Sequence, residues 1–144
     1  MGKKRIVKTE GTAEGSTEAP QAVSAISKKH TDSGILSVQS TYNNTKIVLT
    51  DVKGNTLCWS SSGSLGFRGA KKGTPFAAAK VGEIIGAKAQ AIGIKEVSVV
   101  VRGVGSGRES GIRGFLSKGI NLVSIKDTTP VPHNGAKPKK PRRV

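Results

Sequence analysis

The sequence predicts an α/β fold with a mixed five-stranded sheet, two helices and flexible extensions at both ends. Three short apolar runs between Gly34 and Ser62 are separated by turn residues, which is typical of a three-strand antiparallel meander. Two stretches with helical spacing follow, and each leads into another apolar run. Because a strand that returns to its sheet through a helix makes a right-handed parallel crossover, the last two strands are expected to be parallel.

The meander is predicted from alternation and from its turns. Leu36 and Val38 alternate with polar neighbours, and two further runs follow, Lys46–Asp51 and Thr56–Ser61. The turns are Tyr42–Thr45, expected to be a tight hairpin because Asn tolerates positive φ, and Lys53–Asn55. Asn43 and Asn44 at the hairpin tip are also candidates for hydrogen bonds to RNA, although turn chemistry alone explains them.

Residues 62–73 are expected to form an irregular loop, since glycines interrupt them repeatedly. Arg68, Lys71 and Lys72 lie close together in this loop, and such cations suit phosphate contacts, which position RNA without reading its sequence. Phe67 is expected to anchor the loop to the core rather than to stack on a base. The loop then leads into the start of the first helix.

The first helix is predicted from Thr74, a good N-cap, and Pro75 at the first helical position. Gly93 is a plausible residue for its end. Gly82, Gly86 and several alanines predict a thin helix that can lie close on the sheet. Its apolar stripe consists of Ala78, Val81, Ile85, Ala89 and Ile92.

A β-branched run, Val97–Val101, predicts a strand covered on both faces. The glycine loop after it, Gly103–Gly107, leads into a second helix carrying Ile112, Phe115 and Leu116 at helical spacing. A helix that begins after such a loop offers unpaired N–H groups to an anion, and the glycines allow close approach. The candidate binding residues are Arg102, Gly103, Gly105, Ser106, Gly107 and Arg108, because the two arginines flank the loop.

The glycine spacing matches neither the dinucleotide-binding pattern nor the P-loop. A turn without a ligand is the simpler alternative for the loop by itself.

The final strand is expected to contain Ile120, Leu122, Val123 and Ile125 and to end near Asp127. The predicted divisions are a disordered extension over residues 1–29, an α/β RNA-binding domain over 30–127 and an extended basic tail over 128–144. The tail cations are Lys137, Lys139, Lys140, Arg142 and Arg143.

The net charge is +15, from 24 basic and 9 acidic residues among 144, which indicates a nucleic-acid or other polyanionic partner. Cys58 is the only cysteine, so neither an intrachain disulfide nor a thiolate zinc cluster is expected. No apolar run approaches the roughly 20 residues that span a bilayer. The core carboxylates are dispersed and both histidines lie in the flexible ends, so we expect no enzyme, cofactor, metal site or small-molecule substrate.

Five motifs, in this order and spacing, resemble the family of small-subunit ribosomal protein S-eleven over about Gly34 to Val144. They are Tyr42–Thr45, Gly66–Gly69, Thr74–Ala78, Gly105–Ser110 and Asp127–Gly135. The Pro132–Gly135 stretch with its Lys/Arg-Pro tail resembles the bacterial type. Val104 and Ser106 stand where this family usually carries prolines, and Gly73 replaces a commoner serine.

The resemblance implies a ribonuclease-H-like fold without nuclease chemistry, in a cytoplasmic ribosomal protein. It implies binding to small-subunit rRNA in the platform, beside the mRNA exit path and the region where the messenger's leader pairs with rRNA. It implies neighbours among small-subunit proteins seven, eighteen and twenty-one, and adds Arg113, His133 and Asn134 to the RNA-binding candidates. Two alternatives stay open: a nucleic-acid-processing enzyme on a ribonuclease-H-like sheet, and a nucleotide-binding domain that uses the glycine loop.

Overall fold

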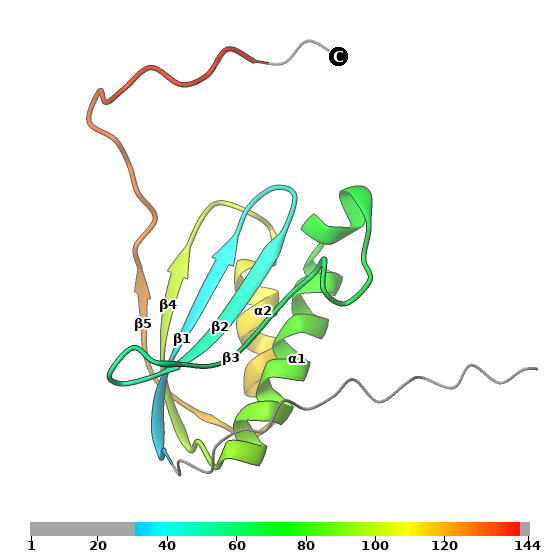
Figure 1. Cartoon of the computed structure of the whole chain (residues 1–144), viewed down its shortest axis with the longest axis vertical. Helices are drawn as coiled ribbons and strands as arrows, with labels where there is room; N and C mark the ends of the chain where they lie inside the picture. Colours follow the sequence, from blue (N-terminus) through cyan, green and yellow to red (C-terminus); the bar gives the residue numbers. More distant parts are fainter. Residues whose placement is uncertain (1–30, 142–144) are drawn as a thin grey trace, which may run out of the picture.

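The computed structural model describes residues 31–141, and its centre is a five-stranded mixed sheet with two helices (Figure 1). The predicted fold class is therefore confirmed. The predicted N-terminal extension, His30, Arg142 and Arg143 lie outside the described residues. The elements are β1 (Ser33–Ser40), β2 (Thr45–Asp51), β3 (Thr56–Ser61), the 3₁₀ helix η1 (Gly69–Gly73), α1 (Pro75–Ile92), β4 (Glu96–Arg102), α2 (Gly107–Leu116) and β5 (Asn121–Asp127).

The strands lie in the order β3-β2-β1-β4-β5. β2 is antiparallel to β1 and to β3, whereas β4 is parallel to β1 and to β5, as the crossovers predicted. Consequently β1, β3, β4 and β5 all finish at the same end of the sheet, where β2 begins. We call this the loop end; its segments are the β1–β2 turn, the loop that contains η1, the glycine loop and the start of the tail.

Both helices lie on one face of the sheet, and the core lies between them and that face (Figure 1). Leu36, Ile47, Leu49 and Phe115 are fully buried there. In β4 burial alternates, with Val97, Val99 and Val101 buried and Ser98 and Val100 only partly so. The prediction that this strand is covered on both faces is therefore wrong, because α1 and α2 pack together on the same side.

Glycines let α1 and α2 approach each other closely. A Cβ on Gly82 would lie 2.2 Å from the Gly111 carbonyl oxygen, and one on Gly114 would lie 2.3 Å from the Ala79 carbonyl oxygen. Gly86 likewise faces α2, where its Cβ would meet the Phe115 carbonyl oxygen at 2.9 Å. The glycine side of α1 thus lies against α2, while Val81, Ile85, Ala89 and Ile92 pack in the core between the helices and the sheet.

The predicted ends of α1 are confirmed. Thr74 Oγ1 accepts a hydrogen bond from Ala77 N at 3.3 Å, Pro75 begins the helix, and Gly93 ends it with φ of 95°.

Cys58 on β3 is buried, and burial raises the pKa of its thiol to about 11 although Lys88 opposes the shift. Cys58 therefore packs as an apolar side chain, as its sequence context predicted.

The β1–β2 hairpin is tight, but its predicted mechanism is wrong. Asn134 is the one non-glycine residue with positive φ among residues 31–141, so neither Asn43 nor Asn44 uses that conformation. The turn is held by Thr41: its backbone N–H donates to the Asn44 carbonyl oxygen at 2.9 Å, and its Oγ1 accepts from Asn44 N at 3.1 Å. In the second turn Gly54 does adopt positive φ, at 88°.

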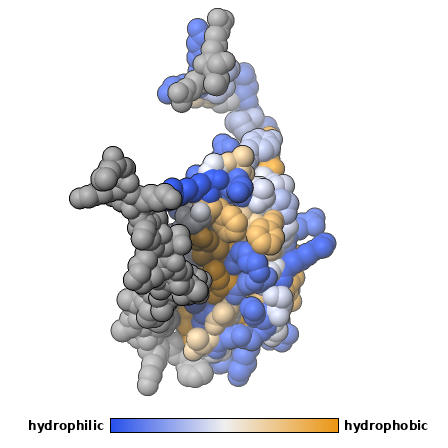
Figure 2. Space-filling model, turned by 90° about the vertical axis from the view of Figure 1, so that its right-hand side faces the viewer, coloured by the Kyte–Doolittle hydropathy of each residue, from blue (hydrophilic) through white to orange (hydrophobic). Residues whose placement is uncertain are grey.

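Figure 2 views the side of the molecule that carries α1 and shows apolar side chains gathered at its centre between polar ones. Beside α1 a hollow of about 310 Å³ lies against the edge strand β3, lined by Trp59, Ser60, Ser64, Leu65, Ile84 and Lys88. None of the helices within residues 31–141 is long and apolar enough to cross a membrane.

Candidate nucleic-acid interface

At the loop end, three segments predicted separately as RNA-binding meet in space. Gly105 N donates to the Ser40 carbonyl oxygen at 3.0 Å, which joins the glycine loop to the β1–β2 turn. Ser106 Oγ donates to the Gly73 carbonyl oxygen at 2.9 Å, which joins the glycine loop to η1. The turn with Asn43 and Asn44, the basic loop and the glycine loop therefore form one continuous surface.

The glycines at these junctions are required by contacts within the chain. A Cβ on Gly103 would lie 2.1 Å from the Ser40 carbonyl oxygen, and a Cβ on Gly105 would lie 2.3 Å from the Thr41 carbonyl oxygen. A Cβ on Gly73 would lie 2.1 Å from the Tyr42 carbonyl oxygen. Gly103 also has φ of 103°, which side chains disfavour. Packing of the chain against itself thus explains them, whether or not a ligand approaches.

Buried hydroxyl groups support this surface from below. Ser40 Oγ and Thr45 Oγ1 lie 3.3 Å apart, and both side chains are fully buried. Ser62 N donates to the Thr45 carbonyl oxygen at 2.9 Å, which fixes the start of the basic loop. A Cβ on Gly107 would lie 2.5 Å from Thr45 Oγ1, so the first residue of α2 rests directly on this cluster.

The basic loop was predicted to be irregular throughout, but its second half forms η1. Lys71 and Lys72 occupy the last turn of η1, Arg68 precedes it, and none of the three makes an ion pair with a described residue. Phe67 was predicted to anchor the loop to the core, and that prediction is wrong. Its ring packs edge-on against Phe76 of α1, with centroids 6.1 Å apart. The loop is thus anchored to α1, and its cations stay available to phosphate.

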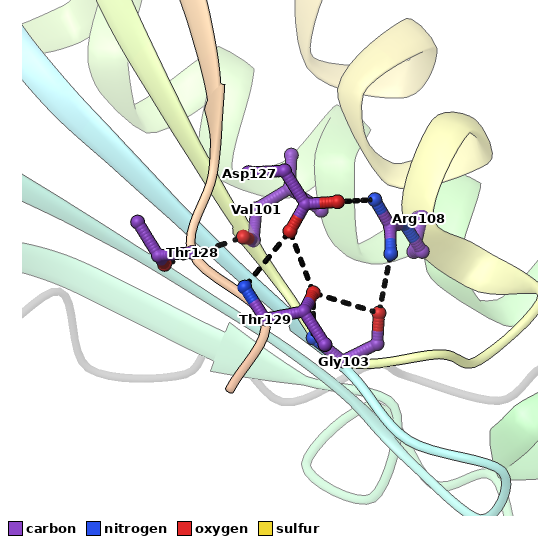
Figure 3. Close-up of polar contacts among 6 residues, drawn as sticks. All are labelled: Val101, Gly103, Arg108, Asp127, Thr128 and Thr129. Carbon is purple, nitrogen blue, oxygen red and sulfur yellow. Dashed lines mark hydrogen bonds and ion pairs between the residues drawn. The ribbon is translucent and has the colours of Figure 1, made fainter. Parts of the chain in front are cut away.

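Arg108 lies in a cluster that joins the glycine loop to the start of the tail (Figure 3). Its Nη1 donates to the Gly103 carbonyl oxygen at 2.6 Å, and its Nη2 pairs with Asp127 Oδ2. Asp127 Oδ1 accepts from Thr129 N at 2.9 Å and from Thr129 Oγ1 at 2.6 Å. Thr129 Oγ1 in turn accepts from Gly103 N at 3.2 Å. We call Val101, Gly103, Arg108, Asp127, Thr128 and Thr129 the Asp127 cluster.

The electrostatics of this cluster follow from its hydrogen bonds. The bonds from Thr129 and then from Arg108 stabilise the charged carboxylate and lower the pKa of Asp127 to about 2. Thr128 N donates to the Val101 carbonyl oxygen at 2.9 Å, so the chain still follows β4 as it leaves β5. The direction in which the tail departs is therefore fixed at the loop end.

A family model described as ribosomal protein S11 matches residues 34–143 of this sequence. The chain belongs to the ribosomal protein S11 family. It is therefore a structural protein of the small ribosomal subunit that binds rRNA. The loop end, which gathers most of the predicted contacts, is the candidate for that binding.

Some predicted contacts of this S11-family chain lie outside the four segments of the loop end. Arg113 lies on the exposed side of α2 and pairs with Glu109 at 3.4 Å. Arg102, at the carboxyl end of β4, is exposed beside Gln39 on the face opposite the helices. Residues 130–141 of the tail are exposed and extend away from the sheet, carrying His133, Asn134, Lys137, Lys139 and Lys140 (Figure 1).

Two features of the S11-family chain were not predicted. The first is the Asp127 cluster, although the Asp127–Thr129 spacing is a signal for a side chain that bonds to the backbone two residues on. The second is the exposure of Trp59 on β3, which is 57% exposed. Among residues 31–141, no group of three His, Cys, Asp or Glu side chains is placed to hold a metal ion.

Proposed function

We propose that the chain binds small-subunit rRNA through its loop end and basic tail, as a bacterial-type, cytoplasmic ribosomal protein. One observation carries this proposal: the basic loop, the glycine loop and the start of the tail converge at one end of the sheet. An extended cationic surface of this kind fits a polyanion that continues over many nucleotides better than it fits one small nucleotide.

The proposed contacts divide into two groups. Arg68, Lys71 and Lys72 contact phosphates, and Asn43 and Asn44 hydrogen-bond nucleotides at the hairpin tip. Arg108 uses two donors inside the chain, and its remaining N–H groups are available to a phosphate. The other proposed contacts are Arg102, Gly103, Gly105, Ser106, Gly107, Arg113, His133, Asn134, Lys137, Lys139, Lys140, Arg142 and Arg143.

We place this binding in the platform, beside the mRNA exit path and the region where the leader pairs with rRNA. Small-subunit proteins seven, eighteen and twenty-one are the proposed neighbours. The proposal keeps the division into an extension over residues 1–29, an RNA-binding domain over 30–127 and a tail over 128–144. It is supported by family membership, together with the tail's departure from the loop end.

Photocrosslinking in assembled small subunits tests the proposal. A photoreactive side chain at position 72 or 137 is expected to crosslink to platform rRNA. The control position is 53, in the exposed β2–β3 turn at the other end of the sheet, and it is expected to give little rRNA crosslinking. Crosslinks from position 53 without any from positions 72 and 137 would contradict the proposal.

A further inference from the structure

The sheet face opposite the helices is covered by no element within residues 31–141; we call it the open face (Figure 1). The strand register places its side chains in rows that cross the sheet. One row contains Lys126, Val100, Ser37, Val48 and Trp59, and the next contains Arg102, Gln39, Lys46 and Ser61. The two rows lie about 7 Å apart, because alternate residues of a strand share a face.

The charges on these two rows all have one sign. Lys46, Arg102 and Lys126 are exposed, and none makes an ion pair within the described part of the chain. The carboxylate whose register places it on the open face is Glu96, two rows below Val100 at the amino end of β4. The residues between the cations, Val100, Ser37, Val48 and Gln39, are uncharged.

Trp59 stands at one end of the first row, on edge strand β3. Trp59 as a residue is 57% exposed, while Cys58 beside it in sequence is buried in the core. An exposed tryptophan contributes little to the core, and every nucleic-acid base can stack on its π-face. Lys126 lies at the other end of that row, four strand spacings or roughly 19 Å away.

A polar hollow connects the open face with the loop end. It measures about 220 Å³ and is lined by Gln39, Thr41, Asn44 and Lys46. Asn44 Oδ1 is buried beside it without a hydrogen-bond partner among the described residues. An RNA strand that contacts the hairpin tip can therefore continue onto the open face without crossing an acidic region.

We propose that the open face binds an unpaired stretch of RNA, with a base stacked on Trp59 and phosphates held by Lys46, Arg102 and Lys126. This inference rests on the proposed function, because it extends the same RNA beyond the loop end. Charge complementarity selects the partner: three cations with no carboxylate between them match a phosphate chain. The aromatic ring selects unpaired rather than paired RNA, since bases within a duplex are already stacked.

The single tryptophan of the chain supplies a direct measurement. Titration of the full chain with a short oligouridylate is expected to quench Trp59 fluorescence, and a paired RNA of equal length is expected to quench it much less. Oligouridylate that binds, by anisotropy of a labelled strand, without changing Trp59 fluorescence would overturn the inference. Equal quenching by the duplex would also overturn it.

Variants separate this surface from the loop end. Trp59→Ala is expected to weaken oligouridylate binding roughly tenfold, and Lys46→Ala and Lys126→Ala severalfold each. Lys53→Ala and Lys95→Ala, which remove the same charge away from the two rows, are expected to leave binding unchanged. Circular dichroism of each variant shows whether it is folded, and the lysine variants keep the test decisive if Trp59→Ala is not.

The two proposals fail differently. If the open-face variants bind like the unsubstituted chain while Arg68→Ala/Lys71→Ala/Lys72→Ala weakens binding, the inference is wrong and the proposed function stands. If that loop variant also binds RNA normally, the proposed function is contradicted as well. If Trp59 fluorescence instead responds to a small-subunit protein and not to RNA, the open face is a protein-binding surface and the inference is again wrong.

Discussion

At the Asp127 carboxylate, three hydrogen bonds, one of them from the Arg108 guanidinium, fix where the tail leaves the sheet. Because the pKa of Asp127 in the folded chain, about 2, lies below its ordinary value of 3.8, the folded state favours the charged form. Its contribution to stability is therefore present above about pH 4 and is lost as the pH falls toward 2. We expect Asp127→Asn to melt at a slightly lower temperature than the unsubstituted chain at pH 7.

The difference in melting temperature between the two proteins is expected to shrink below pH 4 and to vanish near pH 2. A matched control is Asp32→Asn, since the ion pair that Asp32 makes among residues 31–141 is with the exposed Lys95 at 3.4 Å. A difference that persists unchanged to the lowest pH would show that the Asp127 charge contributes nothing. Asp127→Asn is also expected to weaken rRNA binding through the tail, which a binding titration measures.

A second residue-scale prediction concerns Cys58. Because burial raises the pKa of its thiol to about 11, the reactive thiolate is scarce at neutral pH. A thiol reagent is therefore expected to modify the folded chain far more slowly than the chain in denaturant. Rapid modification of the folded protein would show that β3 opens locally. The Lys88→Ala variant is expected to react more slowly still, because Lys88 lowers the pKa of the thiol.

Among the elements, the crossing of α1 over α2 depends on glycine at positions where backbone meets backbone. Gly82→Ala would place a Cβ 2.2 Å from the Gly111 carbonyl oxygen, so the helices must separate. Overpacking costs about 1–3 kcal/mol, and this contact lies at the upper end because backbone yields least. Alanine regains about 1 kcal/mol through helix propensity. The expected net loss in the free energy of unfolding is about 2 kcal/mol, measured by urea titration.

Gly63→Ala serves as the matched control, because the nearest atom to its Cβ, Lys72 Cδ, lies 3.7 Å away. It is expected to unfold at the same urea concentration as the unsubstituted chain. A Gly82→Ala protein of unchanged stability would mean that the two helices can shift apart without loss. The same reasoning applies to the glycine loop, where Gly103 and Gly105 contact the β1–β2 turn rather than another helix.

For the whole molecule, a net charge of +15 predicts that salt governs rRNA affinity. Removal of residues 137–144 takes away the five tail cations. Each phosphate contact contributes about 0.7 on a single strand to about 0.9 on a duplex to the slope of log affinity against log salt, so the loss of five contacts is expected to flatten the slope by about four. A chain of full length with glutamine at those five positions should show the same flattening. An unchanged slope in both proteins would mean that the tail does not contact phosphate.

Local patterns in the sequence determined the five strands, the two α-helices, the caps of Thr74 and Gly93, and the parallel crossovers, because alternation, helical spacing and turn residues act over a few positions. They did not determine η1, which lies in a loop predicted to be irregular. The motifs also indicated the family. Only the tertiary structure decided that both helices cover one face, that Gly82 meets α2 rather than the sheet, and that Arg108 binds Asp127. These features depend on contacts between segments far apart in the chain. The periodicity of a strand's sequence indicates which of its faces is apolar, but it does not indicate which element packs on that face. For the same reason the exposure of Trp59, and with it the open face, could be recognised only after the five strands were placed side by side.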